Sequence, residues 1–478
     1  MHDGELLRRT ADLAGTFLDG LDARPVGRPV DLAALRDAMG GPLGADGEDA
    51  ISVVEGLARS ADRGIVATAG PRYFGFVVGG SQPAALAADW LTSVWDQNAG
   101  LYALSPAAAV AEEIAAGWLI DLLGLPAGSS CGFTTGATMA NFTALAAARN
   151  AVLRARDWDV EERGLFGAPE IHVVLGDEAH VTVFVSLQML GLGRGRVHRV
   201  AADEQGRMRA DALRATLAGL DGPTIVVAQA GNVNTGAFDP LGEIAAAVRE
   251  HGGWLHVDGA FGLWAAASPA LHDRIEGLDL ADSWTTDAHK WLNVPYDSGL
   301  VFVREAAAHR TAMTLGAAYY IETEGSERDN YNWVAESSRR ARGFTIYAAL
   351  RSLGRNGLAT LLDRCCGHAR RFEELLAGRP GVAILNDVVL NQVLVRFAPP
   401  GDAAQDGAAI DAFTRDVITR VQADGTCWLG GTTWHGMAAM RISVSSWATT
   451  EADVERSAAA ILRCAREAAE ARPQVSRA

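Results

Sequence analysis

The scarcest residue type in this 478-residue chain is lysine. Lysine and arginine together number 42, and Lys290 is the only lysine, so the other 41 are arginines. A general preference for arginine would have replaced any lysine needed only for its charge. Unlike a guanidinium, a lysine amine can lose its proton when desolvated and act as a nucleophile. We therefore predict Schiff-base chemistry at Lys290. The competing interpretation is chance survival on a solvated surface, which the flanking Trp291, Leu292 and Val294 disfavour.

Other shortages exclude whole classes of protein. Cysteine occurs only five times, without CxxC spacing, which argues for free thiols and against a zinc site. No apolar run approaches the ~20 residues that span a bilayer, and the first twenty residues resemble an amphipathic helix without a signal core. The net charge is −16, and basic residues form no stripe, which disfavours nucleic acids and anionic membranes as partners. We expect a cytoplasmic protein.

The order of patterns along the chain predicts an α/β protein. Residues 1–68 alternate helical patterns with loops and are interpreted as an N-terminal helical arm. Residues 69–345 carry short apolar strands that begin near 171, 224, 254 and 299 and alternate with helical segments. This alternation predicts a large domain with a mostly parallel sheet covered on both faces. Residues 346–478 contain a long helix, three strands and a closing helix, which predicts a smaller α+β domain.

Small residues begin a predicted helix within CGFTTGATMANFTAL, residues 131–145. Gly136, Ala137 and Thr138 stand where backbone N–H groups and the helix dipole can bind an anion, and small side chains let a phosphate approach. The same pattern is also common in ordinary turns. These residues alone leave both interpretations open.

Three further polar residues follow apolar strands, where ligands of such sheets bind. His180 lies in GDEAHVTV, Asp258 ends the strand of HVDGAFG, and Lys290 lies in DAHKW. Singly, the histidine is consistent with a structural role and the aspartate with a turn cap. Together with an anion-binding helix start, they are the parts that hold pyridoxal phosphate (PLP). The helix would anchor the phosphate, His180 would stack on the ring, Asp258 would keep the pyridine nitrogen protonated, and Lys290 would form the imine.

Seven motifs make the chain similar to a known family over about residues 70–450. They are PRYFGF, SPAAAVAEEIAAGWL, TTGATMANFTAL, DEAH, HVDGAFG, DAHKWLNVPYDSG and SRRARGFTIYAALRSLG. The chain resembles the group II PLP-dependent amino acid decarboxylases of the aspartate aminotransferase fold (fold type I), and looks most like bacterial proteins of the aromatic-L-amino-acid decarboxylase type. The resemblance implies a seven-stranded, mostly parallel sheet and a homodimer with active sites at the interface. Residues 1–68 would then clasp the partner.

The same resemblance implies roles for individual residues. The catalytic set would be Lys290, Asp258, His180 and Tyr331. The remaining cofactor contacts would be Gly136, Ala137 and Thr138 at the phosphate, Asp287 and His289 nearby, Ala260 on the second ring face, and Asn232. The substrate pocket would be lined by Phe76 and Tyr102.

The implied reaction is decarboxylation of an L-amino acid to its amine, with an apolar or aromatic side chain favoured by Phe74, Phe76, Trp95 and Tyr102. These aromatic residues are equally consistent with an interface core. Many relatives return the proton to Cα from a loop tyrosine, and that position is Asn330 here, with Tyr331 one residue later. Transamination, C–C cleavage and oxidative deamination use the same fold and remain alternatives. A non-catalytic relative is a more distant one, against which Lys290 argues.

Overall fold

The computed structural model describes residues 3–27, 29–314, 327–400 and 406–471. Its larger sheet has seven strands in the order β1-β7-β6-β5-β4-β2-β3. In chain order these are β1 (Ser130–Thr134), β2 (His172–Gly176), β3 (Val197–Val200), β4 (Thr224–Gln229), β5 (Trp254–Asp258), β6 (Ser283–Asp287) and β7 (Gly299–Val303). Only β7 runs against its neighbours, β1 and β6. The strands from β6 to β3 are parallel, so their carboxyl ends share one edge.

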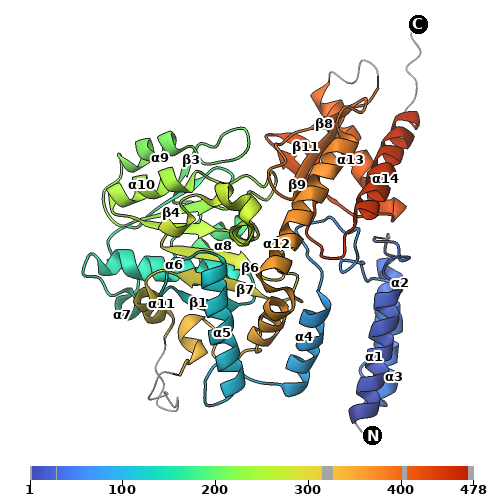
Figure 1. Cartoon of the computed structure of the whole chain (residues 1–478), viewed down its shortest axis with the longest axis horizontal. Coiled ribbons are helices and arrows are strands. Elements are labelled where there is room, and N and C mark those ends of the chain that lie inside the picture. The colour runs from blue at the N-terminus through green and yellow to red at the C-terminus, as the bar shows by residue number, and fades with distance from the viewer. Residues whose placement is uncertain (1–2, 28, 315–326, 401–405, 472–478) are drawn as a thin grey trace.

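Helices cover both faces of this sheet because its strands alternate apolar side chains between the faces. Val173 and Leu175 of β2 pack in a cluster with α6 (Ala137–Arg154) and α8 (Val181–Met189). Val174, between them, belongs to the opposite cluster, which includes α9 (Ala210–Leu217) and α10 (Leu241–His251). The first face also carries α11 (Ala306–Met313), and the short α7 (Val160–Arg163) packs on α6. Figure 1 shows these two helical layers around the strands.

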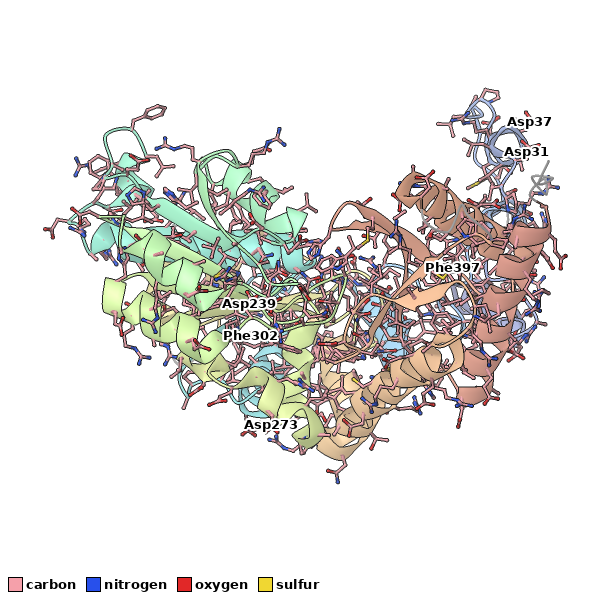
Figure 2. The ribbon with its side chains drawn as sticks, turned by 90° about the horizontal axis from the view of Figure 1, so that it is seen from above. Asp31, Asp37, Asp239, Asp273, Phe302 and Phe397 are labelled. Carbon is pink, nitrogen blue, oxygen red and sulfur yellow. The ribbon has the colours of Figure 1, made fainter. Side chains whose placement is uncertain are left out.

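The smaller sheet has four antiparallel strands in the order β10-β11-β9-β8. They are β8 (Val382–Ile384), β9 (Gln392–Phe397), β10 (Gly430–Trp434) and β11 (Met437–Ser443), with α13 (Gly407–Asp424) and α14 (Glu451–Glu470) packed beside them. The long helix α12 (Gly343–Leu376) connects the two parts and is kinked at Gly354, where φ is 60°. Figure 2 shows Phe302 of the larger sheet and Phe397 of the smaller one on opposite sides of this connection.

The N-terminal segment forms three helices, α1 (Asp3–Asp19), α2 (Leu32–Met39) and α3 (Ala50–Ala61), which pack on one another. None of the residues 4–19, 32–39 and 50–61 is buried. The segment is joined to the body through Arg72, which is 2% exposed. Its guanidinium binds Asp22 of the segment at 2.6 Å, Asp453 of α14 at 2.8 Å and the carbonyl of Thr426 at 2.9 Å. Farther along the chain lie α4 (Pro83–Trp95) and α5 (Pro106–Leu122).

The α/β architecture with a seven-stranded, mostly parallel sheet and a smaller C-terminal sheet is confirmed. Ser105 caps α5, because its hydroxyl accepts the N–H of Ala108. Strands β1, β3 and β6 were not anticipated. Two of them, SCGFT and SWTTD, are fully buried although they are rich in small and hydroxyl side chains. Within the described residues, no helix is both long enough and apolar enough to cross a membrane.

Candidate active site

Lys290 lies in the turn that follows β6, at the edge where the parallel strands end. Its Nζ atom is 3.0 Å from Oδ2 of Asp287, the last residue of β6. The segment before α4 crosses over this turn at very short range. A Cβ atom at Gly79 would lie 1.9 Å from the carbonyl oxygen of Lys290, so only glycine fits there. This close crossing fixes the backbone of the lysine.

A small cavity opens beside the Lys290 side chain. Its walls come from the ends of β4 and β5 and from the start of α8, and they are formed by His180, Gln229, Gly231, Val233, Asp258, Ala260, Phe261 and Lys290. Four of the residues expected at the cofactor therefore meet in one place: His180, Asp258, Ala260 and Lys290.

Asp258 ends β5 and is 4% exposed. One carboxylate oxygen accepts the backbone N–H of Ala260 at 3.2 Å, and the other accepts the side-chain amide of Asn141 at 3.3 Å. Among the described residues, no lysine, arginine or histidine forms an ion pair with it. A buried carboxylate is costly without a positive partner. The protonated pyridine nitrogen of PLP would supply that partner, so Asp258 fits the cofactor.

His180 is the residue that precedes α8 and caps it. Its Nδ1 atom lies 3.4 Å from the backbone N of Thr182 and 2.8 Å from the hydroxyl of the same residue. Burial is the largest effect on the imidazole and lowers its pKa; the charge of Asp258 opposes this, while Lys290 and Arg441 add to it. We therefore expect a neutral ring at pH 7, held by its own helix.

The start of α6 lies against the turn of Lys290. Gly136 precedes the helix, and the N–H of Ala137 donates to Oδ1 of Asp287 at 2.6 Å. A Cβ atom at Gly136 would lie 3.3 Å from the ring of His289, so the glycine keeps this corner open. Burial lowers the pKa of His289, and its Nδ1 accepts the N–H of Ser298. A phosphate bound at the start of α6 would lie beside the carboxylate of Asp287, which already accepts the N–H of Ala137 there.

Thr138 stands in the first turn of α6, where its carbonyl accepts the hydroxyl of Ser186. Gly136, Ala137, Thr138, Asp287 and His289 thus surround one helix start, next to the cavity of Lys290. Their individual roles toward a phosphate stay predictions.

Asn232 stands in the turn after β4. Its side-chain oxygen accepts the N–H groups of Asn234 and Thr235 within that turn, at 2.8 and 3.3 Å. Its neighbours Gly231 and Val233 line the cavity. The carboxamide nitrogen of Asn232 is buried and has no hydrogen-bond partner in the described part of the chain. The expected contact of Asn232 with the ligand stays a prediction.

Two other predicted residues lie together, but they do not line the cavity. The N–H of Tyr102 donates to the carboxylate of Asp329, and the N–H of Tyr331 donates to the carbonyl of Gly100. Tyr331 is 4% exposed. Asn330, at the position of the expected tyrosine, is buried, and its oxygen accepts Nε of Arg328 at 2.7 Å. The preceding loop, residues 315–326, lies outside the described residues.

Phe76 is 63% exposed and stacks on Trp428, with 5.7 Å between ring centroids. Trp428 in turn stacks on Tyr73 at 5.0 Å. The Phe76 backbone has a φ of 58°, a conformation that side chains other than glycine rarely adopt. This outward-facing ring lies three residues before Gly79, on the segment that crosses Lys290.

Sequence reasoning missed two residues of this site. Arg441 of β11 lies close enough to lower the pKa of His180, and burial lowers its own pKa. No hydrogen bond or ion pair of its guanidinium is found in the described part of the chain. Asn141 reaches Asp258 from one turn into α6. The available signals were an arginine between Met440 and Ile442 in an apolar strand, and an asparagine in an alanine-rich helix.

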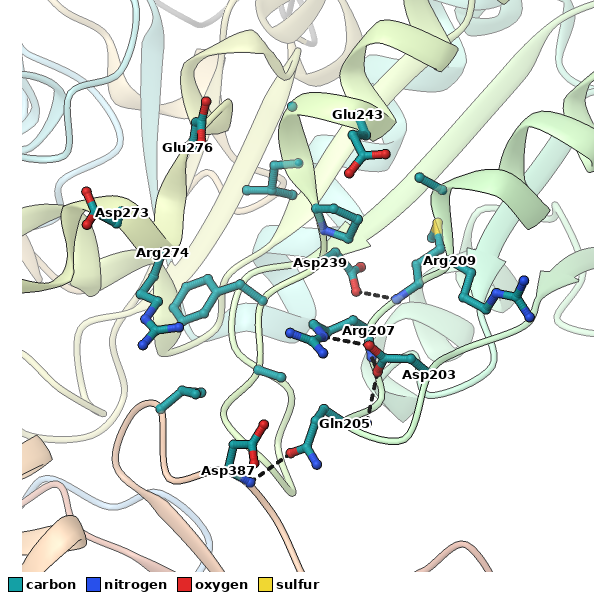
Figure 3. Close-up of a pocket in the computed structure, with 18 of the residues that line it drawn as sticks. Asp203, Gln205, Arg207, Arg209, Asp239, Glu243, Asp273, Arg274, Glu276 and Asp387 are labelled. Atoms are coloured by element: carbon teal, nitrogen blue, oxygen red, sulfur yellow. Dashed lines mark hydrogen bonds and ion pairs between the residues drawn. The ribbon is translucent and has the colours of Figure 1, made fainter.

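A larger open pocket lies elsewhere, between loops of the larger sheet and the segment before β9 (Figure 3). Most of its polar groups already have partners. Asp203 pairs with Arg207 at 2.7 Å, and Asp239 accepts the backbone N–H groups of Met208 and Gln229, each at 2.7 Å. Burial raises the pKa of Asp239 to about 6. Because Gln229 also lines the cavity of Lys290, Asp239 supports the end of β4.

A lysine, a buried carboxylate and a neutral imidazole around one cavity at the carboxyl edge of this sheet define a PLP-dependent enzyme of fold type I. Comparison with known proteins gives the same class. Residues 42–398 match the family model described as the pyridoxal-dependent decarboxylase conserved domain. The chain therefore belongs to the pyridoxal-dependent decarboxylase family. It is a carboxy-lyase, and its cofactor is PLP.

Individual relatives agree. The chain is 26% identical to an aromatic-L-amino-acid decarboxylase of Bacillus atrophaeus, over 93% of this chain and 91% of that protein. It is 32% identical to an L-2,4-diaminobutyrate decarboxylase of Rhizobium meliloti, over 80% and 75%. The fold matches the crystal structure of Oryza sativa TDC with PLP and tryptamine, with a TM-score of 0.90, 23% identity and 97% coverage of both chains.

Proposed function

We propose that this decarboxylase removes the α-carboxylate of an L-amino acid with an apolar or aromatic side chain, using Lys290 to attach PLP. The observation that carries the proposal is the meeting of Lys290, Asp258 and His180 around one cavity. PLP, when bound, withdraws electrons from the substrate Cα and so makes loss of CO₂ accessible. The similarity to an aromatic-L-amino-acid decarboxylase supports the choice of side chain.

The chain's own residues would divide the remaining work. Asp258 would hold the proton of the pyridine nitrogen, since an anion there favours the protonated ring. The neutral imidazole of His180 would lie against one face of the cofactor and the small side chain of Ala260 against the other. The start of α6 would hold the phosphate, with the N–H groups of its first turn as donors.

Arg441 favours a second candidate substrate. Its guanidinium lies near His180 and has no anionic partner among the described residues. A substrate carboxylate would complete it with a charge-assisted pair. In an apolar amino acid, the carboxylate that pairs with Arg441 would be the α-carboxylate. In an acidic amino acid, the side-chain carboxylate could pair with Arg441 instead. Arg72, the other basic residue near the aromatic segment, is already bound to Asp22 and Asp453 and is not available.

A panel of amino acids distinguishes these substrates. Purified protein with PLP would be incubated with L-tryptophan, L-phenylalanine, L-leucine, L-glutamate, L-aspartate and L-2,4-diaminobutyrate, and CO₂, amine, keto acid and aldehyde would be measured. We expect CO₂ and amine from an aromatic or apolar member. Activity on the acidic members alone would replace the first candidate by the second. Keto acid without CO₂ would contradict decarboxylation.

We also propose that the protein is a homodimer clasped by residues 1–68. Helices α1 and α3 carry large apolar side chains that are about half exposed, among them Leu7, Val53 and Leu57. Trp90, Val94 and Trp95 of α4 are similarly exposed. Large exposed apolar side chains gathered on a few helices are typical of an interface. Tyr102 and Tyr331, which do not line the cavity of their own chain, would contribute to the site of the partner.

Light scattering coupled to size-exclusion chromatography tests the dimer. We expect a dimer for the unaltered chain and a shift toward monomer for Leu57→Glu. Phe166→Glu is the matched control, because Phe166 is 99% exposed and lies outside the arm. A monomeric unaltered chain would contradict the proposal of a homodimer.

We also propose a cytoplasmic location. The five cysteines support it, because all of them are free and buried.

A further inference from the structure

A chain of buried polar side chains runs behind Asp258, away from the cavity. Its members come from β5, β6 and α6, and each is at most 6% exposed. In order from the far end they are Trp254, Ser283, His256, Asn141 and finally Asp258, with Thr285 as a side branch. Buried polar groups of this kind are costly unless every member is hydrogen-bonded, and here each link has a partner.

One direction of hydrogen bonding satisfies every member of the chain when Asp258 is a carboxylate. The indole N–H of Trp254 can only donate, and it donates to Oγ of Ser283 at 2.9 Å. In that arrangement the hydroxyl of Ser283 donates its own hydrogen to Nδ1 of His256, also at 2.9 Å. A ring that accepts at Nδ1 carries its proton on Nε2 when neutral. Burial lowers the pKa of His256 to about 4, so the neutral ring is the form present near pH 7.

This tautomer then orients Asn141. Nε2 of His256 lies 2.8 Å from the side-chain oxygen of Asn141 and donates to it. The hydroxyl of Thr285 donates to the same oxygen, also at 2.8 Å. With both donors on its oxygen, the carboxamide must present its NH₂ group to the other side, where Oδ2 of Asp258 lies at 3.3 Å. A flipped amide would place its oxygen against the carboxylate oxygen of Asp258. It would also place its NH₂ group against the donors of His256 and Thr285.

We propose that Asn141 is a positioning residue for the decarboxylase, whose amide orientation, set by Thr285 and by the chain from Trp254 through His256, holds Asp258 as a carboxylate facing the pyridine nitrogen. The inference rests on the proposed role of Asp258. Asn141 donates to one oxygen and the backbone of Ala260 donates to the other, so the carboxylate is fixed from both sides. Donors of this kind favour the charged form of an acid. The same contacts keep the buried carboxylate in place although it forms no ion pair with any described residue.

The test compares Asn141→Leu with Asn150→Leu. Leucine has the same number of side-chain heavy atoms as asparagine, branched at the same carbon, but its side chain neither donates nor accepts. Asn150 lies on the same helix, is also buried, and bonds Glu161 away from the cavity. We expect Asn141→Leu to weaken PLP binding and to lower kcat by roughly tenfold to a hundredfold, the factor for one lost hydrogen bond to a charged group, with a smaller change in KM. The visible absorbance band of the bound cofactor should weaken, whereas Asn150→Leu should keep it.

Two further variants keep the test decisive. Asn141→Thr retains a hydroxyl that can donate to Asp258, so it should recover part of the band and of kcat; it also serves if the leucine variant does not fold. Asp258→Asn separates the two levels of the argument. If Asp258→Asn leaves PLP affinity and the band unchanged, the role of Asp258 itself is wrong. If Asp258→Asn abolishes them and folded Asn141→Leu matches Asn150→Leu, only the inference about Asn141 is overturned.

Discussion

Lys290 and Asp287 form an ion pair, with 3.0 Å between Nζ and Oδ2, and the second oxygen of the same carboxylate accepts the N–H of Ala137 at the start of α6. One side chain thus holds both the reactive amine and a donor at the predicted phosphate site. Loading of PLP must change both contacts.

Asp287→Asn should therefore speed cofactor attachment. The amide oxygen can still accept the Ala137 N–H, but the ion pair that holds Lys290 is gone, as is a negative charge beside the phosphate. We expect the visible band to form roughly tenfold faster when PLP is added to cofactor-free protein, the factor for one charge-assisted hydrogen bond. Stopped-flow absorbance measures it. Slower loading would mean that Asp287 assists the attack.

Lys290→Arg should abolish covalent attachment. Arginine keeps the positive charge near Asp287, but its guanidinium does not lose a proton at neutral pH. The visible band of the bound cofactor should disappear, and borohydride should no longer fix the cofactor to the chain. A surviving, borohydride-sensitive band would exclude Lys290 as the attachment point, because the chain has no other lysine.

Arg441→Met should raise KM by roughly tenfold or more, because it removes a charge-assisted contact to a substrate carboxylate. Arg441→Lys should recover part of the loss. Arg396→Met is the control: it lies on the neighbouring strand β9, and its guanidinium is paired with Asp411 at 2.6 Å. Steady-state kinetics on the best substrate of the panel would check this. An unchanged KM for Arg441→Met would remove Arg441 from the substrate site.

Glu112→Gln should destabilise the fold strongly. Glu112 of α5 and Arg339 are 0% and 2% exposed and form two hydrogen bonds of 2.8 and 2.7 Å. Loss of one charge leaves the other buried without its partner, which costs about 3 kcal/mol or more of unfolding free energy. Asp121→Asn on the same helix is the control, since its pair with Arg355 is exposed and worth about 1 kcal/mol or less. Urea unfolding would compare the two.

Stability should fall with acid between about pH 6.5 and 4. Burial lowers the pKa of His256 to about 4 and of His309 to about 3, so the folded state binds fewer protons than the unfolded one in this range. Their contribution is complete above about pH 6.5 and is lost as the pH falls. Asp239 acts in the opposite sense, because its pKa is raised to about 6 in the folded state. This single group offsets only part of the loss of stability caused by the two histidines.

We expect a loss of roughly 2 kcal/mol of unfolding free energy between pH 7 and pH 5. His309→Gln removes one titrating ring and retains a donor toward the carbonyl of Trp333, the present partner of Nε2. The pH slope of this variant should be flatter. An equal slope would mean that His309 does not cause the acid sensitivity.

Sequence patterns sufficed for the elements whose signal is local. The strand WLHVD and the lysine that follows the next strand are where periodicity and composition predict them. Strands SCGFT and SWTTD were missed because pairing with β7 and burial, and not a run of apolar side chains, make them strands. Their hydroxyl groups are satisfied by partners distant in sequence, such as Ser130 by His309.

The site was predictable to the extent that its residues follow strand ends. Asn141 was missed because it reaches Asp258 across 117 residues of sequence, and Arg441 because its effect on the pKa of His180 crosses from the smaller sheet to the larger one. Asn232 shows how one side chain can serve two purposes. Its oxygen accepts a backbone N–H of its own turn, as asparagines after strands often do, while its ligand contact stays a prediction.

Arg72 bears on how this protein can be shortened. Its buried guanidinium takes one of its two carboxylates from Asp22, within the N-terminal segment, and the other from Asp453 near the opposite end of the chain. Expression of a trimmed protein that begins after residue 22 would leave that charge half neutralised in the interior. A usable shortened version should keep Asp22 or exchange Arg72 for an uncharged residue at the same time.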